Sequence, residues 1–206
     1  MISGFIVKKS TMTNIYTPEG KRIGVTKCVV SPLTVTQVKT KEKDGYQAVQ
    51  VAYGTKKHLD KPVSTKLTKL KLEINPQHFT EFDLTTETIP EVGSNIAIDS
   101  VFAAGDKVSV FGVTKGRGFA GVIKRYGFRR QPVSGGQSDR VRAPGAIGAQ
   151  TPGKVIKGKK MPGHYGNVTK QIKGLKIVSV DVAKNEIILD GPIPGHINSW
   201  VTILKK

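Results

Sequence analysis

The chain has 206 residues, enough for one domain with an appendage or for two small domains. Its 33 Lys and Arg against 15 Asp and Glu give a formal net charge of +18, so we expect a polyanionic partner. A nucleic acid and an anionic membrane surface both meet that requirement. No apolar stretch approaches the roughly 20 residues of a membrane-spanning helix, which favours the nucleic acid.

The N-terminus predicts no signal peptide, because Lys8 and Lys9 follow the first apolar residues instead of preceding them. Cys28 is the single cysteine, so the chain has no internal disulfide. Both features agree with a protein that stays in a reducing cytosol.

Alternating apolar and polar residues predict strands along the first half of the chain. Residues 25–29 and 34–39 show this period of two. Residues 45–53 follow a Lys-Asp-Gly turn, which suggests a hairpin with the preceding strand. Two shorter strands are predicted at 96–98 and 107–111.

Residues 56–92 fit this pattern poorly, since Leu67 and Leu70 stand at helical spacing, and a small helical insertion is predicted there. Later strands at 175–182 and 186–190 flank an Ala-Lys-Asn turn, and a last strand is predicted at 199–204. Many short strands with tight turns predict a mainly β protein, an antiparallel β barrel. Its globular domain would comprise residues 1–112 and 167–206.

A separate basic segment interrupts these strands. Residues 112–174 hold 14 Lys and Arg, 14 of the 23 glycines and a single acid, Asp139. Few helices or strands are expected there, and one interpretation is a flexible, solvated linker. The apolar residues Phe119, Tyr126 and Phe128 instead favour an extended, irregular arm at 113–166 that becomes ordered on binding. Its glycines would let the backbone approach phosphates closely.

The arm also contains a G-x-G-x-x-G string at Gly116, Gly118 and Gly121, which raises the alternative of a dinucleotide-binding enzyme. Such a site requires a helix after the glycines and then a strand that ends in an acid. Pro132 follows soon afterwards, and no acid occurs before Asp139. The scattered histidines make no metal set, and no catalytic motif is present, so neither cofactor, metal nor catalysis is expected.

Two blocks of the arm carry a family resemblance. Residues 114–125, Thr-Lys-Gly-Arg-Gly-Phe-Ala-Gly-Val-Ile-Lys-Arg, resemble the signature of ribosomal large-subunit protein family three. Residues 142–161 resemble the arm of its bacterial members, and residues 8–13 and 191–195 extend the likeness to nearly the whole chain. The chain departs from the family pattern at Ser10, Thr11, Ser109, Val141, Ala146 and Tyr165.

This resemblance implies a six-stranded barrel of the translation-protein type on the outside of the large ribosomal subunit, in the cytoplasm. The arm would reach toward the peptidyl transferase centre without catalysing peptide transfer. The implied partners are 23S-type rRNA, bound directly and early in assembly, and ribosomal protein families fourteen and nineteen. Gln150 stands where some bacterial members are modified, which implies a glutamine methyltransferase as a further partner.

The predicted site consists of cationic side chains and glycine backbone. Side-chain contacts to rRNA are expected from Lys8, Lys9, Lys115, Arg117, Lys124, Arg125, Arg129, Arg130, Arg140, Arg142, Lys154, Lys157, Lys159, Lys160 and His164. Close backbone approach to RNA is expected at Gly116, Gly118, Gly121, Gly145, Gly148 and Gly153. A free RNA chaperone with a disordered arm remains the alternative to a ribosomal component.

Overall fold

The computed structural model describes residues 2–84 and 89–205. The chain divides into two compact units: one comprises the residues up to Val113 together with those from Thr169 onward, and the other is Thr114–Val168. This second unit is the arm. The protein is mainly β, as predicted, and no helix of the described ranges has the length and apolar character to cross a bilayer.

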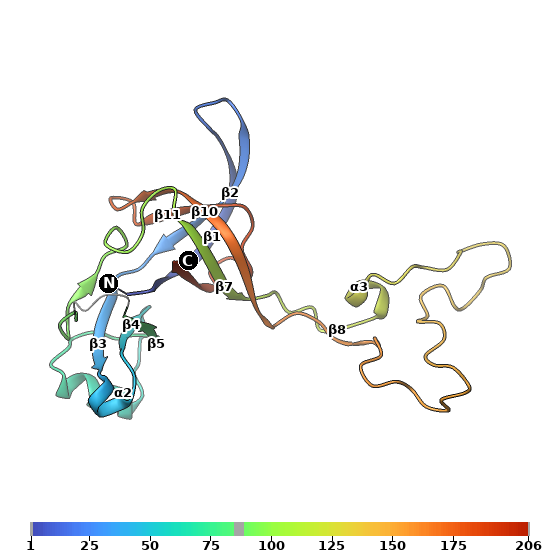
Figure 1. Ribbon diagram of the computed structural model, residues 1–206, viewed down its shortest axis with the longest axis horizontal. Helices are drawn as coiled ribbons and strands as arrows, with labels where there is room; N and C mark the ends of the chain where they lie inside the picture. The colour runs from blue at the N-terminus through green and yellow to red at the C-terminus, as the bar shows by residue number, and fades with distance from the viewer. Residues whose placement is uncertain (1, 85–88, 206) are drawn as a thin grey trace. The chain divides into compact units, whose positions relative to one another are not determined.

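Six strands of the first unit form a sheet that closes on itself (Figure 1). They are β1 (Gly4–Tyr16), β2 (Arg22–Val30), β7 (Lys107–Val113), β10 (Thr169–Asp181), β11 (Glu186–Asp190) and β12 (Trp200–Lys205). Antiparallel pairing runs in the order β1-β12-β7-β10-β11-β2, and β2 pairs again with β1. Alternate residues point inward and are buried, among them Ile187, Leu189, Val201 and Ile203.

Strand β1 was not predicted from the sequence. Phe5, Ile6 and Val7 are consecutive buried residues, so both faces of the strand are covered and no period of two is visible. Beyond a bulge between Lys9 and Met12, the β1–β2 hairpin projects past the closed sheet, and none of residues 10–24 is buried (Figure 1).

A second, four-stranded sheet completes the first unit. Its strands are ordered β5-β4-β3-β6, with β3 (Leu33–Lys39), β4 (Ala48–Tyr53), β5 (His78–Asp83) and β6 (Asn95–Ile96). Two helices, α1 (Lys41–Asp44) and α2 (Lys61–Lys69), connect its strands. The strands predicted at 34–39 and 45–53 therefore correspond to β3 and β4, whereas the one predicted at 96–98 overlaps β6 only at Ile96. All three lie outside the closed sheet.

The helical insertion predicted at 56–92 is wrong in part. Helix α2 occupies its first half, but β5 follows and pairs with β4 along its whole length, from Tyr53 with His78 to Ala48 with Asp83. The helical spacing around Leu67 is real, since that side chain anchors α2 and is buried. In β5 only Phe82 is buried, so the alternation that marks a strand is too weak to detect.

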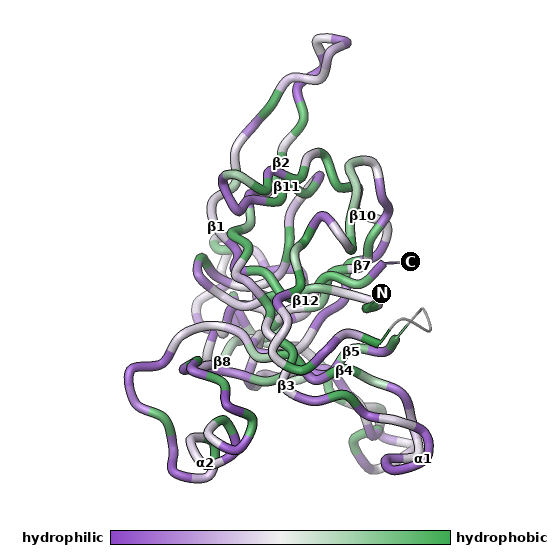
Figure 2. The backbone as a smooth tube through the Cα atoms, turned by 90° about the vertical axis from the view of Figure 1, so that its left-hand side faces the viewer, coloured by the Kyte–Doolittle hydropathy of each residue, from purple (hydrophilic) through white to green (hydrophobic). Residues whose placement is uncertain are grey.

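One cluster of buried hydrophobic residues joins the two sheets. It contains Phe5 and Ile177 from the closed sheet together with Val35, Val49 and Phe82 from the four-stranded sheet. Figure 2 shows the apolar residues concentrated in these strands and polar residues along the connections around α1 and α2. Both sheets therefore depend on the same core and are expected to unfold together.

A polar cluster ties β5 to the end of β3. Lys39 Nζ lies 2.8 Å from Glu81 Oε1, and the Tyr46 hydroxyl donates to Glu81 Oε2 at 2.7 Å. These bonds, the one from Lys39 above all, hold the pKa of the Glu81 carboxyl below its usual value. The bond to Glu81 in turn raises the pKa of Lys39.

We expect Glu81→Gln to reduce the free energy of unfolding slightly at pH 7 and not at all in acid. A carboxylate with a depressed folded pKa stabilises the fold above its unfolded pKa, and this contribution is lost as the pH falls through the folded value. Urea unfolding between about pH 7 and pH 3 measures the difference, with Glu42→Gln on α1 as a control. If the variant were less stable than the wild type by the same amount at every pH in this range, the charge of the Glu81 carboxylate would not contribute to stability.

The arm contains three short elements: β8 (Phe119–Ala120), α3 (Val122–Tyr126) and β9 (Gly163–His164). The remaining arm residues are irregular, as predicted, and turn repeatedly at glycines with positive φ. The expectation that few regular elements form there is correct for most of its length. One exception is the part nearest to Thr114 and Val168, where the two chain segments pair. Another is residues 169–174, which were predicted to be irregular and instead belong to β10.

Candidate nucleic-acid interface

The arm begins as a stem of two antiparallel chain segments. Thr114 N–H donates to Val168 O at 3.0 Å, Arg117 N–H donates to Tyr165 O at 2.8 Å, and Tyr165 N–H donates to Gly118 O at 3.0 Å. Strand β8 then pairs with β9. Residues 114–126 and 161–168 thus form a stem that carries the loop between them, residues 127–160.

Gly166 is required by this stem for two reasons. Its φ is +77°, a conformation that side chains disfavour, and a Cβ atom would overlap the Lys115 carbonyl oxygen. The backbone segments therefore approach each other more closely here than any other residue type would permit. The contacts within the arm are therefore sufficient to explain why residue 166 is a glycine, and no bound partner is needed.

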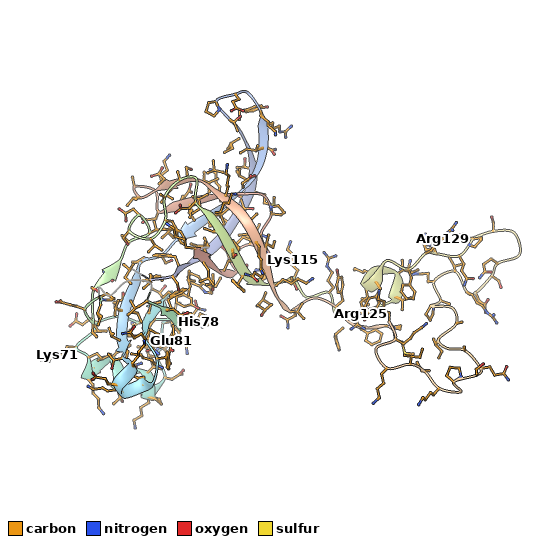
Figure 3. The ribbon with its side chains drawn as sticks, in the orientation of Figure 1. Lys71, His78, Glu81, Lys115, Arg125 and Arg129 are labelled. Atoms are coloured by element: carbon orange, nitrogen blue, oxygen red, sulfur yellow. The ribbon has the colours of Figure 1, made fainter. Side chains whose placement is uncertain are left out.

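Helix α3 is fixed to the returning segment by Arg125. Its Nη1 donates to Met161 O at 2.8 Å, and its guanidinium lies 4.9 Å from the centroid of the Tyr126 ring. The Lys160 ammonium lies 5.7 Å from the same ring. Arg125, labelled in Figure 3, is half-buried and bonded to the returning segment, so together with the Tyr126 ring it gives the irregular loop a defined base.

The other arm cations face solvent. The exposed set comprises Lys115, Arg117, Lys124, Arg129, Arg130, Arg140, Arg142, Lys154, Lys157, Lys159 and Lys160. Within residues 2–84 and 89–205, the four ion pairs all lie in the first unit, so no arm cation is paired with a carboxylate. The arm therefore presents a high density of uncompensated positive charge, which a polyphosphate backbone would neutralise.

Lys9 is a correction to the predicted site. Its side chain is buried, and Nζ donates to Ile193 O at 2.7 Å and to Gly195 O at 3.0 Å. The ammonium thus holds the loop between β11 and β12 against β1 and does not face an RNA phosphate. The neighbouring Lys8 is half-buried, with Nζ 5.9 Å from the Trp200 ring centroid, and its contact with RNA stays a prediction.

An exposed aromatic pair lies on the stem. His164 on β9 is exposed, and its ring meets that of Phe119 on β8 edge to face, with centroids 6.0 Å apart. Phe119 is 72% exposed, an unusual position for a large apolar side chain. His164 was predicted as a base contact but Phe119 was not, although an aromatic residue inside a basic signature is the signal that would have found it.

The six glycines predicted to approach RNA fall into two groups. Gly118, Gly145 and Gly153 have positive φ, so their turns require glycine whether or not RNA is bound. Gly116, Gly121 and Gly148 lack positive φ. A Cβ atom at Gly121, which precedes α3, would have nothing within 4 Å. Nothing within the arm therefore requires glycine at position 121, and the close approach of RNA there stays a prediction.

The arrangement excludes the dinucleotide-binding alternative. A helix does follow Gly121, but α3 has only 5 residues. The next strand, β9, pairs antiparallel with β8, whereas a dinucleotide site requires parallel strands joined by a long helix. The glycine string therefore lacks the setting of a dinucleotide site, and only Gly118 of its three glycines has a positive φ.

Gln150 lies in an exposed turn in which its carbonyl accepts the N–H of Gly153 at 2.9 Å. The side chain is accessible to a modifying enzyme, which is the geometric requirement for the predicted methylation.

Comparisons with known proteins agree with this arrangement. Residues 30–191 match the family of ribosomal protein L3. The large ribosomal subunit protein uL3 of Legionella pneumophila is 44% identical over 206 residues, which cover 98% of this chain and 95% of the relative. The uL3 proteins of Chromohalobacter salexigens and Herpetosiphon aurantiacus are 46% and 40% identical, over 98% of this chain and 97% and 96% of their own length. The similarity extends through both sheets and the arm, and the chain belongs to the ribosomal protein L3 family.

Proposed function

We propose that this protein is a structural constituent of the large ribosomal subunit in the cytoplasm and binds 23S-type rRNA directly. The observation that carries the proposal is the arm, whose exposed Lys and Arg have no carboxylate partner within the described residues. The chain is related over 98% of its length to a large-subunit protein. Folded RNA supplies phosphates at the density that these cations require. The role is architectural and not enzymatic.

We infer the finer features from what the family resemblance implies. The closed six-stranded sheet would act as a barrel of the translation-protein type that remains on the subunit surface. The arm would extend toward the peptidyl transferase centre, where its cations allow RNA helices to pack that would otherwise repel one another. Binding early in assembly would nucleate that packing. The protein partners would be ribosomal protein families fourteen and nineteen.

We also propose that a methyltransferase modifies the Gln150 side-chain nitrogen. The exposed turn at Gln150 supports this, since an enzyme could reach the amide before the arm is enclosed by RNA. The mass of the peptide that contains Gln150, taken from assembled subunits, tests the idea. An unmodified mass would contradict it.

Sedimentation of the cellular protein tests the ribosomal role. After ribosomes are dissociated, we expect the protein in the large-subunit fraction at one copy per subunit, with crosslinks from the arm to rRNA. Recovery mainly at the top of the gradient, with function retained there, would instead indicate a free RNA chaperone.

A further inference from the structure

The positive charge of the first unit is concentrated in one short stretch. Residues 56–71 hold six lysines and one acid, Asp60. Outside this stretch and residues 112–174, the chain contains thirteen Lys and Arg and thirteen Asp and Glu. Apart from the arm segment, therefore, all of the net positive charge comes from the region around α2.

These lysines lie on the outside of α2 and its flanking turns. Leu67 anchors the helix in the protein and is 2% exposed, so the opposite side of the helix faces solvent. Lys57, Lys61, Lys69 and Lys71 are exposed, and Lys71 lies at the periphery of the first unit (Figure 3). These four residues are named the α2 surface. The only acid of the stretch, Asp60, is paired with Lys56 at 3.2 Å. The charge of the four lysines of the α2 surface is therefore not compensated by this acid.

A groove next to this surface contains a positioned ammonium group. It has a volume of about 480 Å³ and lies between α2 and β3, with Lys66, Lys69, Thr65 and Thr36 among its lining residues. Lys66 Nζ donates to Gln50 Oε1 at 2.5 Å, and the same oxygen accepts the Thr36 hydroxyl at 3.0 Å. One of the three ammonium donors thus fixes the position of Lys66. The ammonium also lies 5.3 Å from the Phe79 ring centroid, so at most two donors are available to a ligand.

From these features we infer that the α2 surface and the Lys66 groove form a second RNA-binding site, which contacts backbone phosphates independently of the arm. The inference rests on the proposed function, because it assigns a further surface to the same RNA partner. Compact ammonium groups on flexible stems suit phosphates, which need no exact geometry for recognition.

An acidic protein is the less suitable partner for this surface. Stable protein interfaces are centred on buried apolar or aromatic anchors. None of the exposed large hydrophobic side chains falls within residues 56–71, all of which the structure describes. Charge without an apolar centre is typical of contacts with a nucleic-acid backbone.

Three full-length variants that each remove four positive charges test the inference. The α2-surface variant is Lys57→Gln, Lys61→Gln, Lys69→Gln and Lys71→Asn, where Asn suits the positive φ of 55° at position 71. The arm variant is Arg129→Gln, Arg130→Gln, Arg140→Gln and Arg142→Gln. The control variant is Lys41→Gln, Lys43→Gln, Lys107→Gln and Lys176→Gln, all at exposed positions of the first unit.

The measurement is binding of each variant to a transcript of large-subunit rRNA over a range of salt concentrations. The binding constant K falls as the salt concentration rises, and each lost phosphate contact makes the slope of log K against log salt less steep by about 1. We therefore expect the slope of the α2-surface variant to be less steep than that of the wild type by about 3 to 4. The control should lose far less. Equal slopes for the α2-surface and control variants, with a reduced slope for the arm variant, would overturn the inference while the proposed function stands. Failure of the wild-type protein to bind would contradict both.

Directed hydroxyl-radical cleavage provides a second readout. Burial raises the pKa of the native Cys28 thiol to about 12, so a tethered iron chelate should attach only to an introduced cysteine. From Lys69→Cys we expect cleavage at a defined rRNA segment that differs from the segment cut from Arg129→Cys. Cleavage no stronger than that from Lys43→Cys, the control position, would show that no RNA lies against α2.

Discussion

Removing four arginines from the arm is expected to weaken rRNA binding by about 100-fold or more near physiological salt, without destabilising either sheet. The arm variant, with Gln at positions 129, 130, 140 and 142, changes exposed side chains of the loop at 127–160 and leaves Arg125, Lys160 and the stem intact. Because these guanidiniums have no carboxylate partner within the described residues, the folded protein loses no ion pair. The loss should therefore fall on RNA binding alone.

Two measurements separate this explanation from misfolding. The urea midpoint of the variant, followed through Trp200 in β12, should equal that of the wild type. The slope of log K against log salt should become less steep by about 3 to 4. The control variant carries the same charge, so a comparable loss of affinity in that variant would mean that net charge alone, and not the arm, governs binding.

The arm was the most predictable part of the molecule, since its glycine content and charge set it apart from the rest of the chain. Its family signature, residues 114–125, led to the family that the comparisons confirm. Composition does not reveal pairing, however. The stem between Thr114 and Val168 and the contact of Arg125 with Met161 join residues far apart in sequence, and no local pattern encodes such contacts.

The strands were predicted with similar limits. Alternation located β3 and β7, and in β7 buried and more exposed residues alternate along the strand. A hairpin signature located β11 and the second half of β10, whose first residues, 169–174, had been assigned to the basic segment. Alternation does not say which strands pair, so β3 and its neighbours were assigned to the closed sheet. Strand β1 escaped notice for the opposite reason, since burial on both faces removes the alternation.

Outside the arm, two regions of the sequence resemble the family, and these two regions are in contact in the folded protein. Residues 8–13 begin at the Lys8-Lys9 pair, and residues 191–195 form the loop that Lys9 holds through Ile193 O and Gly195 O. Gly195 has a φ of +94°, and a Cβ atom there would overlap the Ser199 hydroxyl oxygen. One structural link thus joins Lys9 to the loop at 191–195, and the interpretation of Lys9 as a phosphate ligand had missed it.

Replacing Lys9 should destabilise the fold more than Glu81→Gln or the removal of any exposed lysine. Lys9→Met keeps much of the apolar stem but leaves the Ile193 and Gly195 carbonyls without the buried ammonium, at a cost of about 2–4 kcal/mol in the free energy of unfolding. Lys8→Met, next in sequence but only half-buried, should cost less than about 1 kcal/mol. Urea unfolding followed through Trp200 measures both.

The same pair of variants distinguishes the structural role of Lys9 from a role in RNA binding. At a urea concentration where both variants are folded, Lys9→Met should retain the wild-type salt slope for rRNA, because its ammonium is buried between β1 and the loop that precedes β12. A normal unfolding free energy combined with a slope reduced by about 1 would reverse this assignment and restore Lys9 to the phosphate contacts. A reduced free energy of unfolding combined with the wild-type slope would show that Lys9 stabilises the closed sheet. In that role its ammonium links β1 to the loop that precedes β12.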